Sequence, residues 1–255
     1  MKGVVSILLI ISALTGCAKK IPVVLTDTTA VTGTGNSSTN AGNTTGSPAT
    51  SSDGSLTYLA LGDSYTIGES VTQDQSFPYQ LTAQLNTQLK VAAPTIIATT
   101  GWTTLDLING INNSGATTKM YNFVTLLIGV NDQYQGMSQE AFRSRFIALL
   151  NTAIKFANGD KNRVFVISIP DYSVTPYVSG NNTETLTRIA LEINAFNGVS
   201  KVESDKVGVN YINITDISQQ AANDRSLLAP DGLHPSAKMY SLWVQRLVPL
   251  VKSKL

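Results

Sequence analysis

The sequence predicts an α/β fold in which helices cover both faces of a parallel sheet. From Leu56 onward, short apolar runs that suit strands alternate with longer segments whose apolar residues recur at helical spacing. Several apolar runs end abruptly in small and polar residues, as at Gly62-Asp63-Ser64. About 200 residues follow this pattern without an internal repeat, which is an ordinary size for one domain.

Composition excludes several classes of function. The chain has 255 residues, a formal net charge of +1 and 14% charged residues, so it carries no basic field for nucleic acid. Its one cysteine is Cys17 and its one histidine is His234, which excludes an intrachain disulfide and argues against a zinc site. We therefore expect no metal, no cofactor and no nucleic-acid partner, and any histidine chemistry must use His234.

Residues 1–16 have the layout of a signal peptide. A positive start at Lys2 precedes an almost entirely apolar run, Val4 to Leu14, that is too short to span a bilayer. Leu14-Thr15-Gly16-Cys17 resembles the lipobox of bacterial lipoproteins, which implies cleavage before Cys17 and lipidation of that cysteine. The alternative is a plain secretory signal with an incidental cysteine. The lipoprotein interpretation predicts an anchor in a membrane of the cell envelope, and Ala18 favours the outer membrane where one exists.

Residues 17–55 are predicted to be the lipidated cysteine and a disordered tether. The stretch from Thr26 to Ser55 is rich in Thr, Ser, Gly and Asn and nearly lacks large apolar side chains. Such a segment cannot bury enough surface to offset the entropy lost on ordering. A recognition segment rich in Ser and Thr is the alternative. Residues 56–255 then form the folded domain.

The first half of that domain is expected to contain three strands and two helices. Leucines at positions 81, 85 and 89 recur at helical spacing, whereas the strands are short apolar runs. The expected elements are a strand at Leu56–Leu61, a helix at Phe77–Leu89, a strand at Thr95–Ala98, a short helix at Thr103–Ile111 and a buried strand at Phe123–Ile128.

The second half continues the alternation. Ser138 can cap a helix whose apolar stripe runs from Phe142 to Ile154. Pro170 stops the fourth strand, and Pro235 suits the first turn of the last helix. The expected elements are a helix after Ser138, a strand at Arg163–Ile169, a helix at Thr183–Glu203, a strand at Val209–Ile214 and a last helix that starts at Pro235.

Four short segments follow strands or precede the last helix. The carboxyl ends of parallel strands share one edge of the sheet, where open α/β sheets bind their ligands, so distant residues can converge there. The segments are Gly62-Asp63-Ser64, Thr99-Thr100-Gly101-Trp102, Gly129-Val130-Asn131-Asp132 and Asp231-Gly232-Leu233-His234-Pro235.

Ser64 is the candidate nucleophile, and the last segment can supply its base and acid. A nucleophilic serine needs a general base whose second ring nitrogen is held by an acid. Gly232 permits a tight bend, and Pro235 favours extended backbone at His234. Asp231 can then reach Nδ1 of His234 and leave Nε2 facing Ser64. The alternatives are an ordinary turn at the serine and a helix-capping loop with an incidental histidine.

Two further residues can stabilise the oxyanion that develops when an ester carbonyl is attacked. The backbone N–H groups of Ser64 and Gly101 and the side-chain amide of Asn131 offer three donors. A side chain at position 101 could block the substrate, and an aspartate at position 131 could only accept hydrogen bonds. Taken singly, a turn glycine and an Asx turn are the alternatives, but the four segments together favour hydrolysis.

The four segments together resemble the four blocks of the SGNH (GDSL-type) hydrolase family. The resemblance covers Leu56 to Leu255, and both the block order and the alternation of strands and helices match. It implies a three-layer α/β/α, flavodoxin-like fold with a five-stranded parallel sheet in the order 2-1-3-4-5. It also implies metal-free hydrolysis of esters or thioesters.

By position, the resemblance assigns roles to the residues already singled out. The nucleophile would be Ser64, the general base and then acid His234, and the orienting acid Asp231. The oxyanion hole would be formed by Ser64, Gly101 and Asn131.

Two residues depart from what relatives or other hydrolases show. Glu69 stands where many relatives are richer in glycine, which affects the shape and charge of the pocket entrance. Thr66 occupies the last position of a Gly-x-Ser-x-Gly elbow, which argues against the ordinary α/β-hydrolase fold.

The residues beside these candidates are expected to have other roles. Asp63 and Asp132 are expected to bond loop backbone rather than to act as the triad acid. Trp102 and Tyr65 either line a pocket or pack beside it, and Asp171-Tyr172 can form another wall.

The sequence therefore predicts a serine hydrolase, anchored at the cell envelope, that cleaves acyl or acetyl esters through an acyl-enzyme. The membrane anchor suggests a lipid or lysophospholipid ester, whereas a tether that reaches the wall suggests O-acetyl groups on envelope polysaccharide. An acyltransferase and a non-catalytic binding lipoprotein are the remaining alternatives.

Overall fold

Five apolar runs of the chain pair side by side as one parallel sheet. In this computed structural model, which describes residues 53–255, the strand order is β2-β1-β3-β4-β5, as the family resemblance implies. The predicted signal peptide, Cys17 and nearly all of the tether lie outside the described residues. The strands are β1 (Tyr58–Gly62), β2 (Thr95–Ala98), β3 (Phe123–Leu127), β4 (Val164–Ile167) and β5 (Asn210–Ile212).

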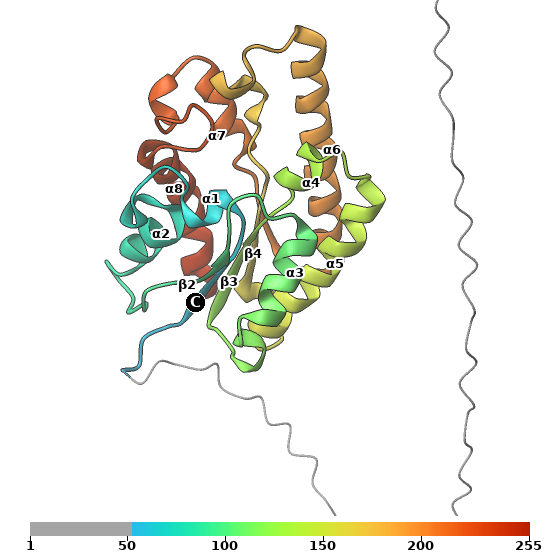
Figure 1. The fold of residues 1–255 in the computed structure, drawn as a ribbon. Helices are drawn as coiled ribbons and strands as arrows, with labels where there is room; N and C mark the ends of the chain where they lie inside the picture. Colours follow the sequence, from blue (N-terminus) through green and yellow to red (C-terminus); the bar gives the residue numbers. More distant parts are fainter. Residues whose placement is uncertain (1–52) are drawn as a thin grey trace, which may run out of the picture. The chain divides into compact units, whose positions relative to one another are not determined.

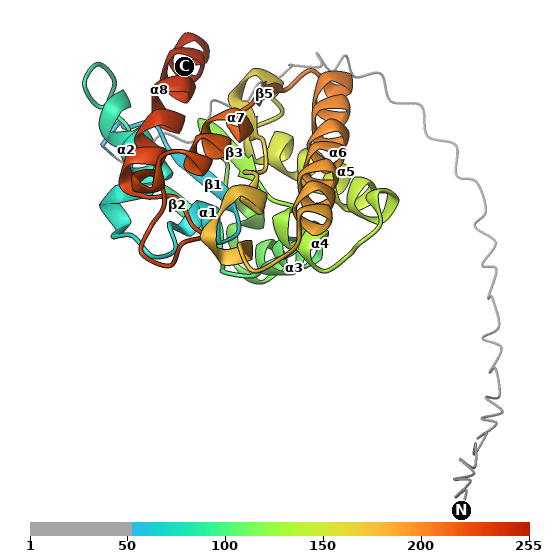
Figure 2. The ribbon, with the colours of Figure 1, turned by 90° about the horizontal axis from the view of Figure 1, so that it is seen from above.

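Helices cover both faces of this sheet and make three layers (Figures 1 and 2). On one side lie α2 (Phe77–Leu85) and α8 (Ala237–Lys254), which pack on each other. On the other side lie α3 (Thr104–Asn113), α5 (Gln139–Phe156) and α6 (Thr183–Val207). Within residues 53–255, none of the helices has the length and apolar character needed to cross a membrane.

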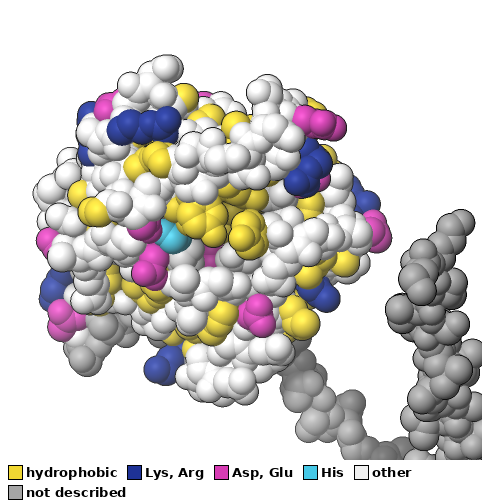
Figure 3. Space-filling model, turned by 45° about the horizontal axis from the view of Figure 1, so that its top comes forward, with side chains coloured by type: hydrophobic (Ala, Val, Ile, Leu, Met, Phe, Trp, Pro, Cys, Tyr) yellow, Lys and Arg dark blue, Asp and Glu magenta, His cyan; other side chains and the backbone are white. Residues whose placement is uncertain are grey.

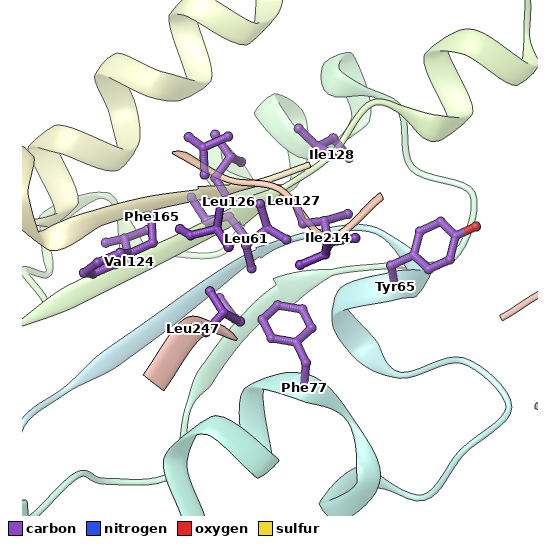
Figure 4. Close-up of a cluster of buried hydrophobic side chains, with 14 of the residues drawn as sticks. Leu61, Tyr65, Phe77, Val124, Leu126, Leu127, Ile128, Phe165, Ile214 and Leu247 are labelled. Carbon is purple, nitrogen blue, oxygen red and sulfur yellow. The ribbon is translucent and has the colours of Figure 1, made fainter. Parts of the chain in front are cut away.

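The core forms because the central strands are apolar on both faces. Every residue of β1 and of β3 is buried. Figure 4 shows Phe77 from α2 and Leu247 from α8 pointing toward the strands from the same side. The polar exception is Thr125 in β3, whose hydroxyl shares a hydrogen bond of 2.8 Å with the hydroxyl of Tyr58 in β1. That bond satisfies both hydroxyls in the buried core.

Several predicted boundaries hold, but others are wrong: α2 ends at Leu85 rather than Leu89, and α6 continues past Glu203 to Val207. Ser138 caps α5, since its side chain accepts a hydrogen bond from the N–H of Ala141. The last helix does not start at Pro235. Pro235 lies in an isolated antiparallel bridge with Leu228, and Ser236 caps α8, which begins at Ala237. A serine side chain satisfies the free N–H groups of a helix start, which a proline cannot do.

Three short helices were not predicted, and two of them shape the sheet edge where the strands end. They are α1 (Ser64–Ile67), α4 (Val130–Tyr134) and α7 (Thr215–Gln219). Helix α1 directly follows β1 and α4 directly follows β3, and these two strands are paired with Gly62 beside Leu127. A Cβ at Gly62 would collide with the Thr66 side chain and the Leu127 carbonyl, so the bend into α1 requires glycine.

Candidate active site

Ser64, His234 and Asp231 form one line of contacts at this edge of the sheet. The Oγ of Ser64 lies 3.0 Å from Nε2 of His234, and Nδ1 of His234 lies 2.6 Å from Oδ2 of Asp231. The serine and the histidine are both buried. With the imidazole proton on Nδ1, the ring donates to Asp231 and leaves Nε2 free to accept from the Ser64 hydroxyl.

The Asp231 side chain closes the loop from Asp231 to His234 by hydrogen bonding to its backbone. Oδ1 of Asp231 accepts hydrogen bonds from the N–H groups of Leu233 at 2.9 Å and His234 at 3.0 Å. Gly232 has a φ of +69°, the left-handed bend that the sequence predicts at this position. The loop therefore holds one carboxylate oxygen on the backbone and presents the other to the imidazole.

Ser70 is a further contact of the Asp231 carboxylate, and no sequence motif marks it. Its Oγ donates to Oδ2 of Asp231 at 2.6 Å, the same oxygen that faces His234. Ser70 is one of two non-glycine residues with positive φ among the described residues, at +65°. Such a conformation costs free energy, so the surrounding contacts must favour it. The serine connects the segment after the nucleophile to the loop that carries the acid.

The two aspartates near the nucleophile differ sharply in charge state. Burial alone would raise the pKa of Asp231, but hydrogen bonds from Ser70, His234 and two backbone N–H groups hold it well below its usual value. Burial raises the pKa of Asp63 to about 8, and the hydrogen bond from the Tyr65 N–H lowers it only in part. At neutral pH Asp231 is therefore ionised and Asp63 largely neutral, so only Asp231 can pair with an imidazolium.

Asp63→Asn is expected to reduce the loss of stability that occurs as the pH rises from about 4 to about 8. The folded-state pKa of Asp63 is about 8, against about 3.9 in an unfolded chain. Between these values the folded protein binds a proton that the unfolded chain has released, so the free energy of unfolding falls with rising pH. Full stability from this group is present below the unfolded pKa and is lost as the pH passes the folded pKa.

Asparagine does not titrate, so the free energy of unfolding of the variant should lack this decrease with rising pH, which is on the order of a few kcal/mol in the wild type. Urea unfolding of both proteins at pH values from 4 to 9 measures it. Parallel stability curves for the two proteins would show that Asp63 does not titrate in this range.

Asp132 fixes the start of helix α3. Its carboxylate accepts from the N–H of Thr104 at 2.8 Å and from the Thr104 hydroxyl at 2.5 Å. Burial raises the pKa of Asp132, and the two hydrogen bonds from Thr104 lower it only in part. Asp63 and Asp132 thus bond backbone N–H groups, as the sequence predicts, whereas the carboxylate that contacts His234 is that of Asp231.

Gly101 and Asn131 lie together beside the serine. One N–H of the Asn131 side chain donates to the carbonyl of Trp102 at 2.9 Å, which leaves the second N–H of that amide for another acceptor. Gly101 has a φ of +82°, and a Cβ there would meet no other atom within 4 Å. Left-handed backbone, rather than contact with protein atoms, therefore makes glycine suitable at 101. The Ser64 N–H lies in the first turn of α1, where backbone N–H groups have no acceptor within the helix.

A small cavity opens in front of these groups. It has a volume of about 130 Å³ and includes Ser64, Gly101, Asn131 and His234 in its wall. Figure 3 shows the histidine beside a gathering of hydrophobic side chains on this face. The remaining lining residues are Tyr65, Thr100, Val130, Tyr134, Tyr172, Tyr177 and Leu233.

The aromatic residues singled out in the sequence take different positions. Tyr65 is buried, lines the cavity and packs its ring 5.5 Å from that of His234. Trp102 does not line the cavity, because its ring lies against Gly110 of α3. Tyr172 forms a wall, as predicted, whereas Asp171 caps the turn at Tyr172–Val174.

Glu69 is absent from the cavity wall among the described residues. Its carboxylate accepts a hydrogen bond from the hydroxyl of Thr100, which does line the cavity. The acidic group that departs from the family pattern therefore lies next to Thr100, partly exposed to solvent, and adds negative charge near the entrance.

Sequence reasoning missed Tyr134 and Tyr177 as cavity residues. Tyr134 lies three positions after Asn131, so recognition of the short helix α4 would have placed both on one face. Tyr177 belongs to a turn at Pro176–Val178 in the loop after β4, and its N–H donates to the Gly232 carbonyl at 3.2 Å. That long-range contact helps to hold Tyr177 at the site, and no local sequence pattern marks it.

Comparison with known proteins gives a consistent result. The model of the GDSL-like lipase/acylhydrolase family matches residues 60–242. The structure is similar to a lipase/acylhydrolase from Enterococcus faecalis, with a TM-score of 0.61 and 19% identity over 78% of this chain and 97% of that chain. No curated protein matches the chain in sequence.

Two further structures share the fold at low identity. TesA has a TM-score of 0.60 and 17% identity, over 78% of this chain and 99% of its own. The psychrotrophic esterase EstA from Pseudoalteromonas sp., in a structure inhibited by monoethylphosphonate, has a TM-score of 0.59 and 16% identity, over 78% and 97%.

Proposed function

The chain belongs to the GDSL-like lipase/acylhydrolase family and is an SGNH-type carboxylic ester hydrolase, and from this premise we propose that Ser64 is its nucleophile and works through an acyl-enzyme. The observation that carries the proposal is the line of contacts at 2.6 Å and 3.0 Å from Asp231 through His234 to Ser64. In an ester hydrolase this arrangement activates the serine hydroxyl.

In the first half of the proposed reaction, Nε2 of His234 takes the hydroxyl proton while Oγ of Ser64 bonds to the ester carbonyl carbon. Asp231, ionised, stabilises the imidazolium that forms. The tetrahedral intermediate then expels the alcohol, which receives the proton from His234, and the acyl group remains on Ser64. In the second half, water gives its proton to His234 and attacks the acyl carbon, and Ser64 leaves with that proton.

The oxyanion of each tetrahedral intermediate is proposed to lie against Ser64, Gly101 and Asn131. The bond from Asn131 to the Trp102 carbonyl supports this role, because it holds the amide rigidly beside Gly101 before substrate binds. Donors that are fixed in advance do not have to reorganise during the reaction.

We also propose that the enzyme acts at the cell envelope, tethered through lipidated Cys17. The support is the sequence alone: an apolar run, then Leu14-Thr15-Gly16-Cys17, then a segment poor in large apolar residues.

Phosphonate labelling tests the nucleophile. The full chain treated with an alkyl fluorophosphonate is expected to gain one phosphonyl group on Ser64, located by peptide mass spectrometry, because an activated serine displaces fluoride. The Ser64→Ala variant should stay unlabelled. Equal labelling of that variant, or an unlabelled wild type where a known serine esterase reacts fully, would exclude Ser64 as the nucleophile.

A further inference from the structure

The cavity at Ser64 favours a short acyl group. Its volume is about 130 Å³, and Val130, Leu233 and tyrosine rings form much of its wall. An apolar cavity of about 150 Å³ in another protein accommodates benzene, so this one suits an acyl group of only a few carbons. A long acyl chain would not fit inside and would extend out of the cavity.

A larger groove adjoins this cavity. Tyr134, Tyr172 and Tyr177 line both of them, and the groove has a volume of about 560 Å³. The residues Tyr134 and Tyr177 are 60% and 54% exposed. A hydrogen bond with Tyr134 raises the pKa of Tyr177, which fits the position of both residues in the walls of cavity and groove.

Beyond the tyrosines, the groove is polar. Asn181 donates its amide to the Val178 carbonyl at 3.0 Å, which leaves its side-chain oxygen as an acceptor. Thr185 contributes a hydroxyl near the start of α6. The other lining residues are Gln133, Gly136, Val178, Arg188 and Ile189.

The charge of the groove does not suit a phosphate headgroup. Its one charged lining residue among those described is Arg188, whose Nη1 donates to both oxygens of Glu192 at 2.9 and 3.1 Å. Glu192 also accepts from the side chain of Gln133 at 2.7 Å. The guanidinium is therefore paired, and Glu69 beside Thr100 adds negative charge near the cavity entrance.

We propose that the substrate is an O-acylated sugar, with its short acyl group in the cavity and its sugar ring in the groove. The sugar lies on the exposed faces of Tyr134 and Tyr177, and its hydroxyls bond to Asn181, Thr185 and Arg188. Aromatic faces with a few placed polar groups are what a neutral, polyhydroxylated ligand requires. This inference rests on the ester hydrolysis proposed for Ser64 and deepens it by naming the class of alcohol.

The test compares kcat/KM for three esters by acid release in a pH-stat: mono-O-acetylated cellobiose, ethyl acetate and the lauroyl ester of glycerol. The wild type is expected to prefer the acetylated sugar to ethyl acetate by at least about tenfold.

Tyr177→Ala removes a stacking face and Thr185→Trp fills the groove. Each should lower the ratio of sugar ester to ethyl acetate by about tenfold, which corresponds to roughly 1.4 kcal/mol.

Leu191→Ala is the control, since Leu191 is 64% exposed on α6 and lines neither the cavity nor the groove. It should leave the ratio unchanged. Hydrolysis of ethyl acetate with a ratio that both groove variants leave unchanged would overturn the sugar assignment, as would a preference for the lauroyl ester. In both cases the esterase assignment stands. Failure to cleave any of the three esters, together with an unlabelled Ser64, would instead refute the proposed function itself.

Discussion

Ser64→Ala is expected to lower kcat by a factor on the order of 10⁴ to 10⁶, the range seen when the nucleophile of a serine hydrolase is removed. The reason is specific to this site. Without Oγ, the His234 imidazole has no hydroxyl at 3.0 Å to activate. The nearby hydroxyl of Thr66 cannot replace it, because Thr66 is fully buried behind Gly62. The remaining rate would come from the oxyanion donors acting on water.

The fold should survive this substitution, since the Ser64 side chain makes its hydrogen bond to His234 and the core does not depend on it. Turnover of a short-chain ester and thermal unfolding, measured on the same samples, separate catalysis from stability. Ser114→Ala is a matched control, because Ser114 ends α3 and bonds only the local backbone. A Ser64→Ala enzyme that keeps more than about a tenth of wild-type kcat would refute the acyl-enzyme mechanism.

His234→Ala should cost nearly as much, with kcat reduced by about 10⁴ or more, because general base and nucleophile act as one unit. No second histidine exists in the chain to take over its part. The double variant Ser64→Ala/His234→Ala should therefore be no slower than either single variant by more than a few-fold. Losses that multiply in the double variant would show that the two residues act independently.

Ser70→Ala provides the matched comparison for His234→Ala. It removes one hydrogen bond to Asp231, but the contacts from His234 and from two backbone N–H groups remain. Its effect on kcat should therefore be at most about a hundredfold, far less than the loss in His234→Ala, since a single hydrogen bond to a charged group contributes roughly 1.5–3 kcal/mol and the carboxylate keeps the others. Kinetics of the three variants in parallel give the comparison directly.

The parts of the fold that the sequence predicted depend on local patterns. Apolar runs marked the strands, and Ser138 marked a helix start that the structure confirms. The sheet order came from the family resemblance rather than from these patterns. The convergence of Ser64, Asp231 and His234 followed from parallel strands, which bring their carboxyl ends to one edge.

What sequence reasoning missed depends on contacts between distant segments or on short helices. Helix α4 has five residues, too few for a periodic pattern, so Tyr134 was not placed beside the cavity. Pro235 was taken for a helix start because its pairing with Leu228 cannot be read from a proline alone. The hydrogen bond from Ser70 to Asp231 joins residues 161 positions apart and has no local signature.

The wide separation of the triad along the chain ties activity to the completion of folding. Ser64 and His234 are 170 positions apart, and every strand of the sheet lies between the start of β1 and the histidine. Such non-local contacts form late, after the entropy of closing a long loop has been lost. If Ser64, Asp231 and His234 act as proposed, the nascent polypeptide has no esterase activity until the chain has been made up to the start of its last helix. Under the proposed mechanism we therefore expect the onset of ester cleavage to report refolding, and a translation product that ends before residue 231 to lack esterase activity.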